Sequence, residues 1–186
     1  MLNTRFVTLA VIILAAAAMR LLPHPPNVTP IAAMALFGAS HFVNRYAGFL
    51  VILMAMVLSD LVLGLIVYQY GLFHSGMPFV YFSFIVIFGI GLWIRNRLSP
   101  LSIGVAALSS SFLFFVLTNF GVWLTDGLFP ITWDGLVACY YAAIPFYRNT
   151  FAGDLFYTLL FFGGFALAQR YAPVLRMESA AAHSSL

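Results

Sequence analysis

Long apolar stretches alternate with short polar or proline-containing stretches along the whole chain. A helix needs about 20 consecutive apolar residues to cross the ~30 Å hydrocarbon core of a membrane. The pattern therefore predicts six helical segments, at residues 6–22, 30–43, 47–68, 78–94, 101–124 and 150–169. At ~1.5 Å per residue the second segment is too short to cross the core upright. We expect it to be sheltered by other helices, or to extend through residues 27–29.

The connection between the first two segments, from Arg20 to Pro30, is the least membrane-like part of the chain. We call it the lip. It holds His24, Asn27 and four prolines. Proline lacks a backbone N–H, fixes φ and disfavours a helical conformation at the preceding residue, so the first helix should end near Leu22. We therefore predict that His24 and Asn27 lie on a stiff, non-helical segment at a membrane face. The alanine- and glycine-rich run after the lip suits close helix packing.

Two stretches near the end of the chain carry separate predictions. Residues 136–146 are only partly apolar and include Pro145. We predict a re-entrant or interfacial piece there, because a span would move the C-terminus to the other side of the membrane. The residues after Pro173 are rich in alanine, serine and histidine, which predicts a disordered cytoplasmic tail at 173–186. Residues 1–172 then form a single domain.

Composition fixes the class of protein. Of the 186 residues, 63% are hydrophobic and only 7% are charged, with a mean hydropathy of +1.04. A soluble domain carries about a quarter charged residues, so we predict an all-α integral membrane protein. The basic residues are all arginines scattered at segment ends, which indicates helix anchoring and argues against a nucleic-acid surface. The single cysteine, Cys139, excludes an intramolecular disulfide and a cysteine-built zinc site.

Arginine placement predicts the orientation. Six segments place both termini on one side, and arginine is enriched on the cytoplasmic side of membrane proteins. The terminal side would carry Arg5, Arg45, Arg95, Arg97, Arg170 and Arg176, and the other side would carry Arg20 and Arg148. We therefore expect cytoplasmic N- and C-termini and a location in the bacterial cytoplasmic (inner) membrane.

With this topology, polar residues gather at the outer face. A charge at membrane depth is costly and is normally paired or directed into a cavity. We therefore predict an outward-facing, ligand-binding pocket. Its candidate residues are His24, Asn27, Asp60, His74, Tyr81, Asn119, Arg148 and Asp154. Asp60 could instead be a structural partner of Arg20 or of Arg148.

Enzyme signatures are weak. The chain lacks a GxSxG motif, an HExxH motif and a glycine-rich phosphate loop. We therefore expect a binding or transport protein, with a small molecule and the lipid bilayer as its partners. One alternative is an intramembrane enzyme that uses His24 or His74 as a base and Asp60 or Asp154 to orient it. Another is a structural subunit of a larger membrane complex.

Several motifs resemble the substrate-binding S-components of energy-coupling-factor vitamin transporters. They are Thr-Pro-Ile-Ala-Ala-Met-Ala-Leu-Phe-Gly-Ala at 29–39 and Ser-Asp-Leu-Val-Leu-Gly at 59–64. Within this group the chain resembles a set of small bacterial membrane proteins. Among these it is similar to the solitary cobalamin-transporting S-components. The stretches that carry this narrower likeness are Arg-Leu-Leu-Pro-His-Pro-Pro-Asn at 20–27, Leu-Ser-Asp-Leu at 58–61, Thr-Asn-Phe-Gly-Val-Trp at 118–123 and Tyr-Arg-Asn-Thr at 147–150.

The resemblance implies a six-helix bundle that takes up a vitamin-like molecule, with cobalamin as the substrate and no cofactor of its own. It places His24, Asp60, Tyr81 and Arg148 around the vitamin. The cobalamin family is expected to have a cobalt-binding cysteine in the second outer loop, where this chain has His74. Imidazole can replace it as a cobalt ligand. The first helix lacks the usual Ala-x-x-x-Ala surface, which argues against docking to a shared energy-coupling module.

Overall fold

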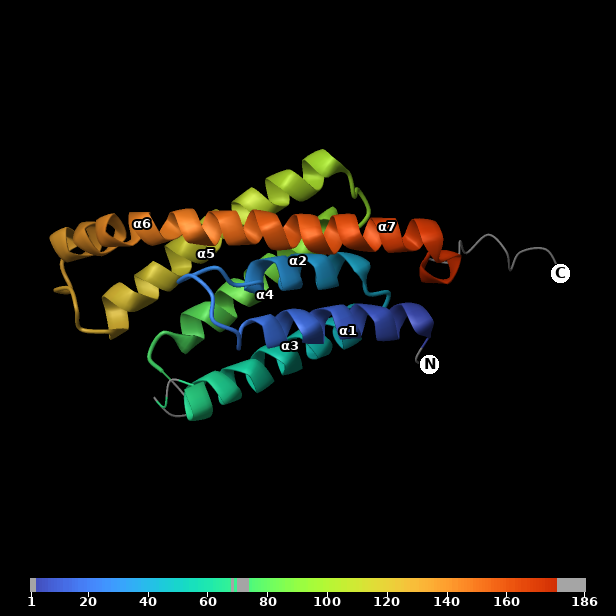
Figure 1. The fold of residues 1–186 in the computed structure, drawn as a ribbon. Coiled ribbons are helices and arrows are strands. Elements are labelled where there is room, and N and C mark those ends of the chain that lie inside the picture. Colours follow the sequence, from blue (N-terminus) through green and yellow to red (C-terminus); the bar gives the residue numbers. More distant parts are fainter. Residues whose placement is uncertain (1–2, 68, 70–73, 177–186) are drawn as a thin grey trace.

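The computed structural model describes residues 3–67, 69 and 74–176, which form an all-helical bundle without strands (Figure 1). The elements in chain order are α1 (Thr4–Met19), α2 (Ile31–His41), α3 (Arg45–Val62), the π-helical turn η1 (Leu63–Val67), α4 (Met77–Ile94), α5 (Pro100–Thr125), α6 (Trp133–Thr158), the π-helical turn η2 (Leu159–Gly163), α7 (Gly164–Tyr171) and the 3-10 turn η3 (Pro173–Leu175). The predicted helical segments are confirmed, with one major extension. The end of the third segment, at residue 68, lies outside the described residues.

Polar residues at the helix starts fix these boundaries. The Asn44 side chain accepts hydrogen bonds from the first turn of α3, and Thr132 accepts one from the first turn of α6. At the start of α5, Ser99 and Ser102 form a reciprocal capping box. Each cap satisfies backbone N–H groups that have no partner inside the helix. The starts of these helices are therefore encoded locally.

α6, η2 and α7 form one continuous helix of 39 residues, from Trp133 to Tyr171 (Figure 1). The prediction that residues 136–146 form a piece separate from the last helix is therefore wrong, and their interfacial position stays a prediction. Pro145 lies inside α6 and does not break it. A proline removes only one intrahelical hydrogen bond, and packed neighbouring helices can hold the axis through that defect. At ~1.5 Å per residue the helix is about 58 Å long, well beyond a ~30 Å membrane core.

Four helices in the described part of the chain are long and apolar enough to cross a membrane. They are Arg45–Val67, Met77–Ile94, Pro100–Thr125 and Trp133–Tyr171. Many large apolar side chains on the outside of the bundle are exposed, including Trp93 on α4 and Leu101 on α5. These features are compatible with a multi-pass membrane protein.

The short helix α2 is the centre of the bundle. Every one of its residues is buried, and it packs against α1, α3, α4, α5 and α6. Small residues allow this close packing: a Cβ added at Gly91 of α4 would lie 2.7 Å from the backbone oxygen of Leu36. The expectation that the second segment is sheltered by protein is confirmed.

The start of α1 and the end of α7 lie at the same end of the bundle (Figure 1). Buried Arg5 donates hydrogen bonds to the backbone oxygens of Leu175 and His41, which ties the two ends together. The predicted tail began at residue 173, but η3 is ordered and Leu175 is buried. The domain therefore extends to at least residue 176. The rest of the predicted tail, 177–186, lies outside the described residues.

Candidate functional site

A buried ion pair lies at the end of the bundle opposite the termini. Arg20, just after α1, donates from Nη2 to Oδ1 of Asp60 over 2.6 Å, and its Nη1 donates to Ser59. The hydroxyl of Tyr81 on α4 donates to the other Asp60 oxygen over 2.7 Å. Asp60 is 7% exposed. Of the two arginines that the sequence offered as partners, the structure selects Arg20.

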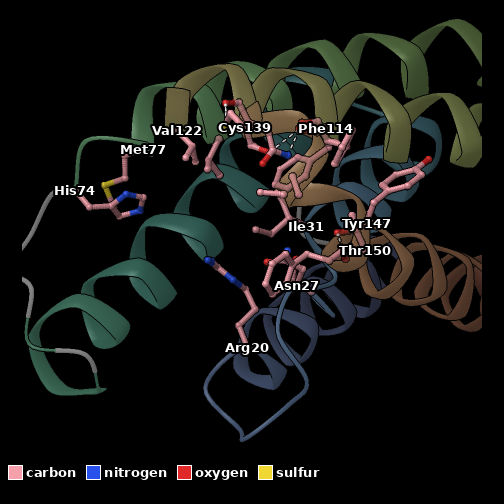
Figure 2. A pocket seen from close by; sticks show the side chains of 18 of the residues that line it. Arg20, Asn27, Ile31, His74, Met77, Phe114, Val122, Cys139, Tyr147 and Thr150 are labelled. Atoms are coloured by element: carbon pink, nitrogen blue, oxygen red, sulfur yellow. Dashed lines mark hydrogen bonds between the residues drawn. The ribbon is translucent and has the colours of Figure 1, made fainter. Parts of the chain in front are cut away.

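A cavity of about 410 Å³ opens beside this ion pair (Figure 2). Its wall is built by the lip, the start of α2, the end of α3, the start of α4, the second half of α5 and the middle of α6. These segments meet because consecutive helices run in opposite directions. The lining includes Arg20, Asn27, Met77, Asn119, Cys139 and Tyr147. Arg20 and Asp60 form the only salt bridge in the described lining, and their opposite charges offset each other there.

One face of α6 supplies a complete wall of the cavity. Its lining positions are Cys139, Ala142, Ala143, Phe146, Tyr147 and Thr150. This spacing of three and four residues places them on one side of a helix. On α5 the lining positions are Phe114, Phe115, Thr118, Asn119 and Val122, which follow the same rule. Tyr140 donates to the backbone oxygen of Val116 over 2.7 Å and joins the two helices.

The polar groups of these walls retain acceptor capacity. Thr118 donates to the backbone oxygen of Phe114, and Asn119 donates to that of Phe115. A threonine hydroxyl or an amide oxygen can still accept hydrogen bonds after such donation. The cavity therefore offers acceptors from α5, and the mixed polar and apolar lining suits an uncharged molecule with donor groups.

The lip closes the cavity from one side. Asn27 has a φ of 65°, in the left-handed region that asparagine tolerates better than most residues. The Asn149 side chain of α6 donates to the backbone oxygen of Pro26 over 3.0 Å. The lip is thus attached to the helix that carries one wall of the cavity.

The predicted site residues divide into two groups. Asn27, Asp60, His74 and Asn119 line the cavity, and Tyr81 reaches its wall through Asp60. Exposed His74 stands at the rim, next to the start of α4 (Figure 2). The other three predicted residues do not line the cavity: His24, Arg148 and Asp154.

Each of these three residues has a different setting. The His24 ring nitrogen Nδ1 lies 3.0 Å from the backbone oxygen of Pro25, and none of its hydrogen bonds in the described structure goes to a carboxylate. Arg148 is exposed, because it lies off the α6 stripe that faces the cavity. Asp154 is on that stripe but buried below the cavity, at 4% exposure.

Sequence reasoning missed Thr118, Tyr147 and Thr150 as lining residues. Tyr147 and Thr150 flank Arg148 in the motif at 147–150, and Thr118 precedes Asn119. A helical reading of 139–150 would have placed Tyr147 and Thr150 on one face and Arg148 off it. The prediction of a re-entrant or interfacial piece at 136–146 hid this signal.

Residues 3–67, 69 and 74–176 contain no group of three or more His, Cys, Asp or Glu side chains suited to hold a metal ion. The resemblance to S-components offered His74 as a metal-binding residue only in the sense of a ligand to cobalt within a bound corrinoid. That prediction concerns the substrate and not a resident metal.

Comparison with known proteins gives one assignment. No curated protein and no solved structure matches the chain. The profile of one family, described as a family of unknown function (DUF6580), matches residues 1–175, which is nearly the whole chain. The chain therefore belongs to the family of unknown function DUF6580.

Proposed function

We propose that this chain is a multi-pass protein of the bacterial cytoplasmic membrane that takes up a vitamin-like small molecule. The observation that carries the proposal is the cavity of about 410 Å³ with its mixed lining. Sites for small molecules are concave, about 300–1,000 Å³ in volume and mostly apolar with a few placed polar groups. The cavity lies at the end opposite the termini, so cytoplasmic termini would open it to the outside.

The distribution of arginine supports this orientation. Arg20 and Arg148 lie at the cavity end, whereas the helix ends near the termini carry Arg5, Arg45 and Arg95. Arginine-rich ends favour the cytoplasmic side. The apolar exterior of the four long helices supplies the lipid-facing surface of such a protein.

Cobalamin is the first ligand to test, on the basis of the resemblance to S-components. A corrinoid with its nucleotide loop is larger than the drug-sized molecules that fill cavities of this volume. Part of it would therefore extend beyond the cavity. Exposed His74 at the rim is placed to coordinate cobalt outside the cavity through a neutral ring nitrogen. Uptake without a shared energy-coupling module remains part of the proposal.

The test is a binding spectrum. The full chain is purified in detergent, incubated with cobalamin or with cobinamide, freed of excess ligand and measured by visible absorbance. The proposal predicts retained corrinoid with a shifted spectrum. His74→Ala should abolish the shift, and His24→Ala, which changes a histidine outside the cavity, should keep it. Retention that is unaffected by His74→Ala would remove the cobalt ligand but keep the vitamin, and absence of any corrinoid would refute the cobalamin assignment.

A further inference from the structure

The walls of the cavity continue inward by one helical turn on both α5 and α6. On α6 the next position after Thr150 on the lining face is Asp154. On α5 the position one turn before Phe114 and Phe115 is Ser111. Positions three or four residues apart lie one above the other on a helix. Asp154 and Ser111 therefore lie just beneath the floor of the cavity.

Asp154 is buried and has no counter-charge in the described part of the chain. It is 4% exposed, and its Oδ2 has no hydrogen-bond partner among the residues that the structure describes. The Ser111 side chain is near enough to interact with the carboxyl group, yet its 1% exposed hydroxyl also lacks a regular hydrogen bond. Ser110, next in the chain, is buried with an unpaired hydroxyl as well. Unpaired buried oxygen atoms are rare in folded proteins and call for an explanation.

Among the residues that the structure describes, the elements around Asp154 supply no compensating cation. α6 packs against α2 and α5, and the lip packs on Gly153, the neighbour of Asp154 in the chain. In the lip, Arg20 is paired with Asp60, and His24 contacts the backbone oxygen of Pro25. α5 contains no titratable residue, and α2 contains only His41, at its far end. On the long helix itself, Arg148 is exposed on another face. A carboxylate in such surroundings is unfavourable, and the group takes up a proton instead.

We propose that Asp154 is a proton-binding site that loads and unloads through the cavity. Thr150 lines the cavity and precedes Asp154 by one turn. Water in the cavity is therefore separated from Asp154 by a single turn of α6. A proton fits the site better than Na⁺, because a metal cation needs several oxygen ligands and the described structure gathers one carboxyl and one hydroxyl group here. The π-helical turn η2 begins at Leu159, within two turns of Asp154, and such turns are frequent at functional sites.

Carboxyl groups inside membrane proteins commonly belong to proton relays. A proton site below the cavity would let the state of the cavity and the charge of Asp154 influence each other. A ligand or water that enters the cavity would stabilise the ionised form of Asp154. Protonated Asp154 would instead favour a cavity without water. The inference shares its cavity with the proposed function but needs no ligand, so the two can fail separately.

The first test is infrared spectroscopy of the full chain in lipid nanodiscs, without ligand. The inference predicts a carbonyl-stretch band of a protonated carboxylic acid at neutral pH. Asp154→Asn should remove this band, whereas Asp126→Asn, which changes an exposed carboxyl group, should leave it. A neutral-pH spectrum without an Asp154-dependent acid band would overturn the assignment. Loss of the band when choline chloride is replaced by sodium chloride would mark a sodium site and overturn the proton assignment.

The second test addresses access through the cavity. Ala142 lines the cavity and Ala152 is an exposed α6 residue away from it, so Ala142→Phe fills the cavity and Ala152→Phe is the matched control. The exchange of the Asp154 proton for deuterium is followed by the shift of the acid band. Exchange should be slowed several-fold by Ala142→Phe and unchanged by Ala152→Phe. Equal rates in the two variants would refute loading through the cavity.

Discussion

Asp60 and Asp154 are both buried aspartates, but the side chains around them differ. Both are nearly fully buried, at 7% and 4% exposure, and each precedes a π-helical turn. Asp60 is held by the Arg20 guanidinium and the Tyr81 hydroxyl, whereas Asp154 has an unpaired oxygen and no counter-charge in the described structure. Asp60 is therefore a fixed part of the cavity wall, held by its ion pair with Arg20. Asp154 is a neutral acid that can change its charge.

Asp60→Asn should give the largest effect on stability. It leaves the buried Arg20 guanidinium without its counter-charge, and breaking a buried ion pair from one side costs about 3–5 kcal/mol. The measurement is the free energy of unfolding in detergent with chemical denaturant. The double variant Arg20→Met with Asp60→Asn removes the stranded charge and should recover much of the loss. A single variant as stable as the wild type would show that the pair does not hold α3 and the lip together.

Tyr81→Phe should have an intermediate effect. It removes one hydrogen bond to the ionised Asp60 carboxyl group, and such bonds contribute about 1.5–3 kcal/mol. Tyr141→Phe is the matched control, because Tyr141 is 77% exposed and should change stability by less than about 0.5 kcal/mol. Thermal unfolding of the two variants side by side gives the comparison. Equal midpoints would contradict a stabilising hydrogen bond between Tyr81 and Asp60.

Asp154→Asn should have the smallest effect, although it makes the same chemical change as Asp60→Asn. A neutral amide replaces a neutral acid of nearly the same shape, so the free energy of unfolding should change by less than about 1 kcal/mol. Denaturant unfolding at neutral pH measures it. A loss as large as that of Asp60→Asn would mean that Asp154 is ionised and paired in the folded protein.

The sequence was informative about helices and less so about which residues meet. Apolar runs located the segments, because each run must bury its backbone hydrogen bonds inside a helix. The same reasoning placed Asp60 and Asn119 at one end of the bundle, and the structure puts both on the cavity. It could not choose between Arg20 and Arg148 as the partner of Asp60, since both lie at that end. Only the three-dimensional packing of the lip decides this.

The error on α6 had a specific cause. Pro145, together with an arginine distribution that a further span would have worsened, outweighed a clear helical stripe that begins at Cys139 and ends at Asp154. Proline is a strong signal in a soluble helix, where water can take over the freed backbone groups, but a weaker one inside a packed membrane bundle. Recognising the stripe would have moved Arg148 off the cavity and placed Tyr147 and Thr150 on it.

The central claim is that the cavity binds a small molecule, and ligand retention tests it most directly. Wild-type protein, Ala142→Phe and Ala152→Phe are each incubated with a mixture of vitamins, freed of unbound material and analysed by mass spectrometry for compounds that remain bound. The prediction is one vitamin-like compound retained in proportion to protein by the wild type and by Ala152→Phe, and lost from Ala142→Phe. Retention that survives filling of the cavity, or no retention by any of the three proteins, would contradict the claim.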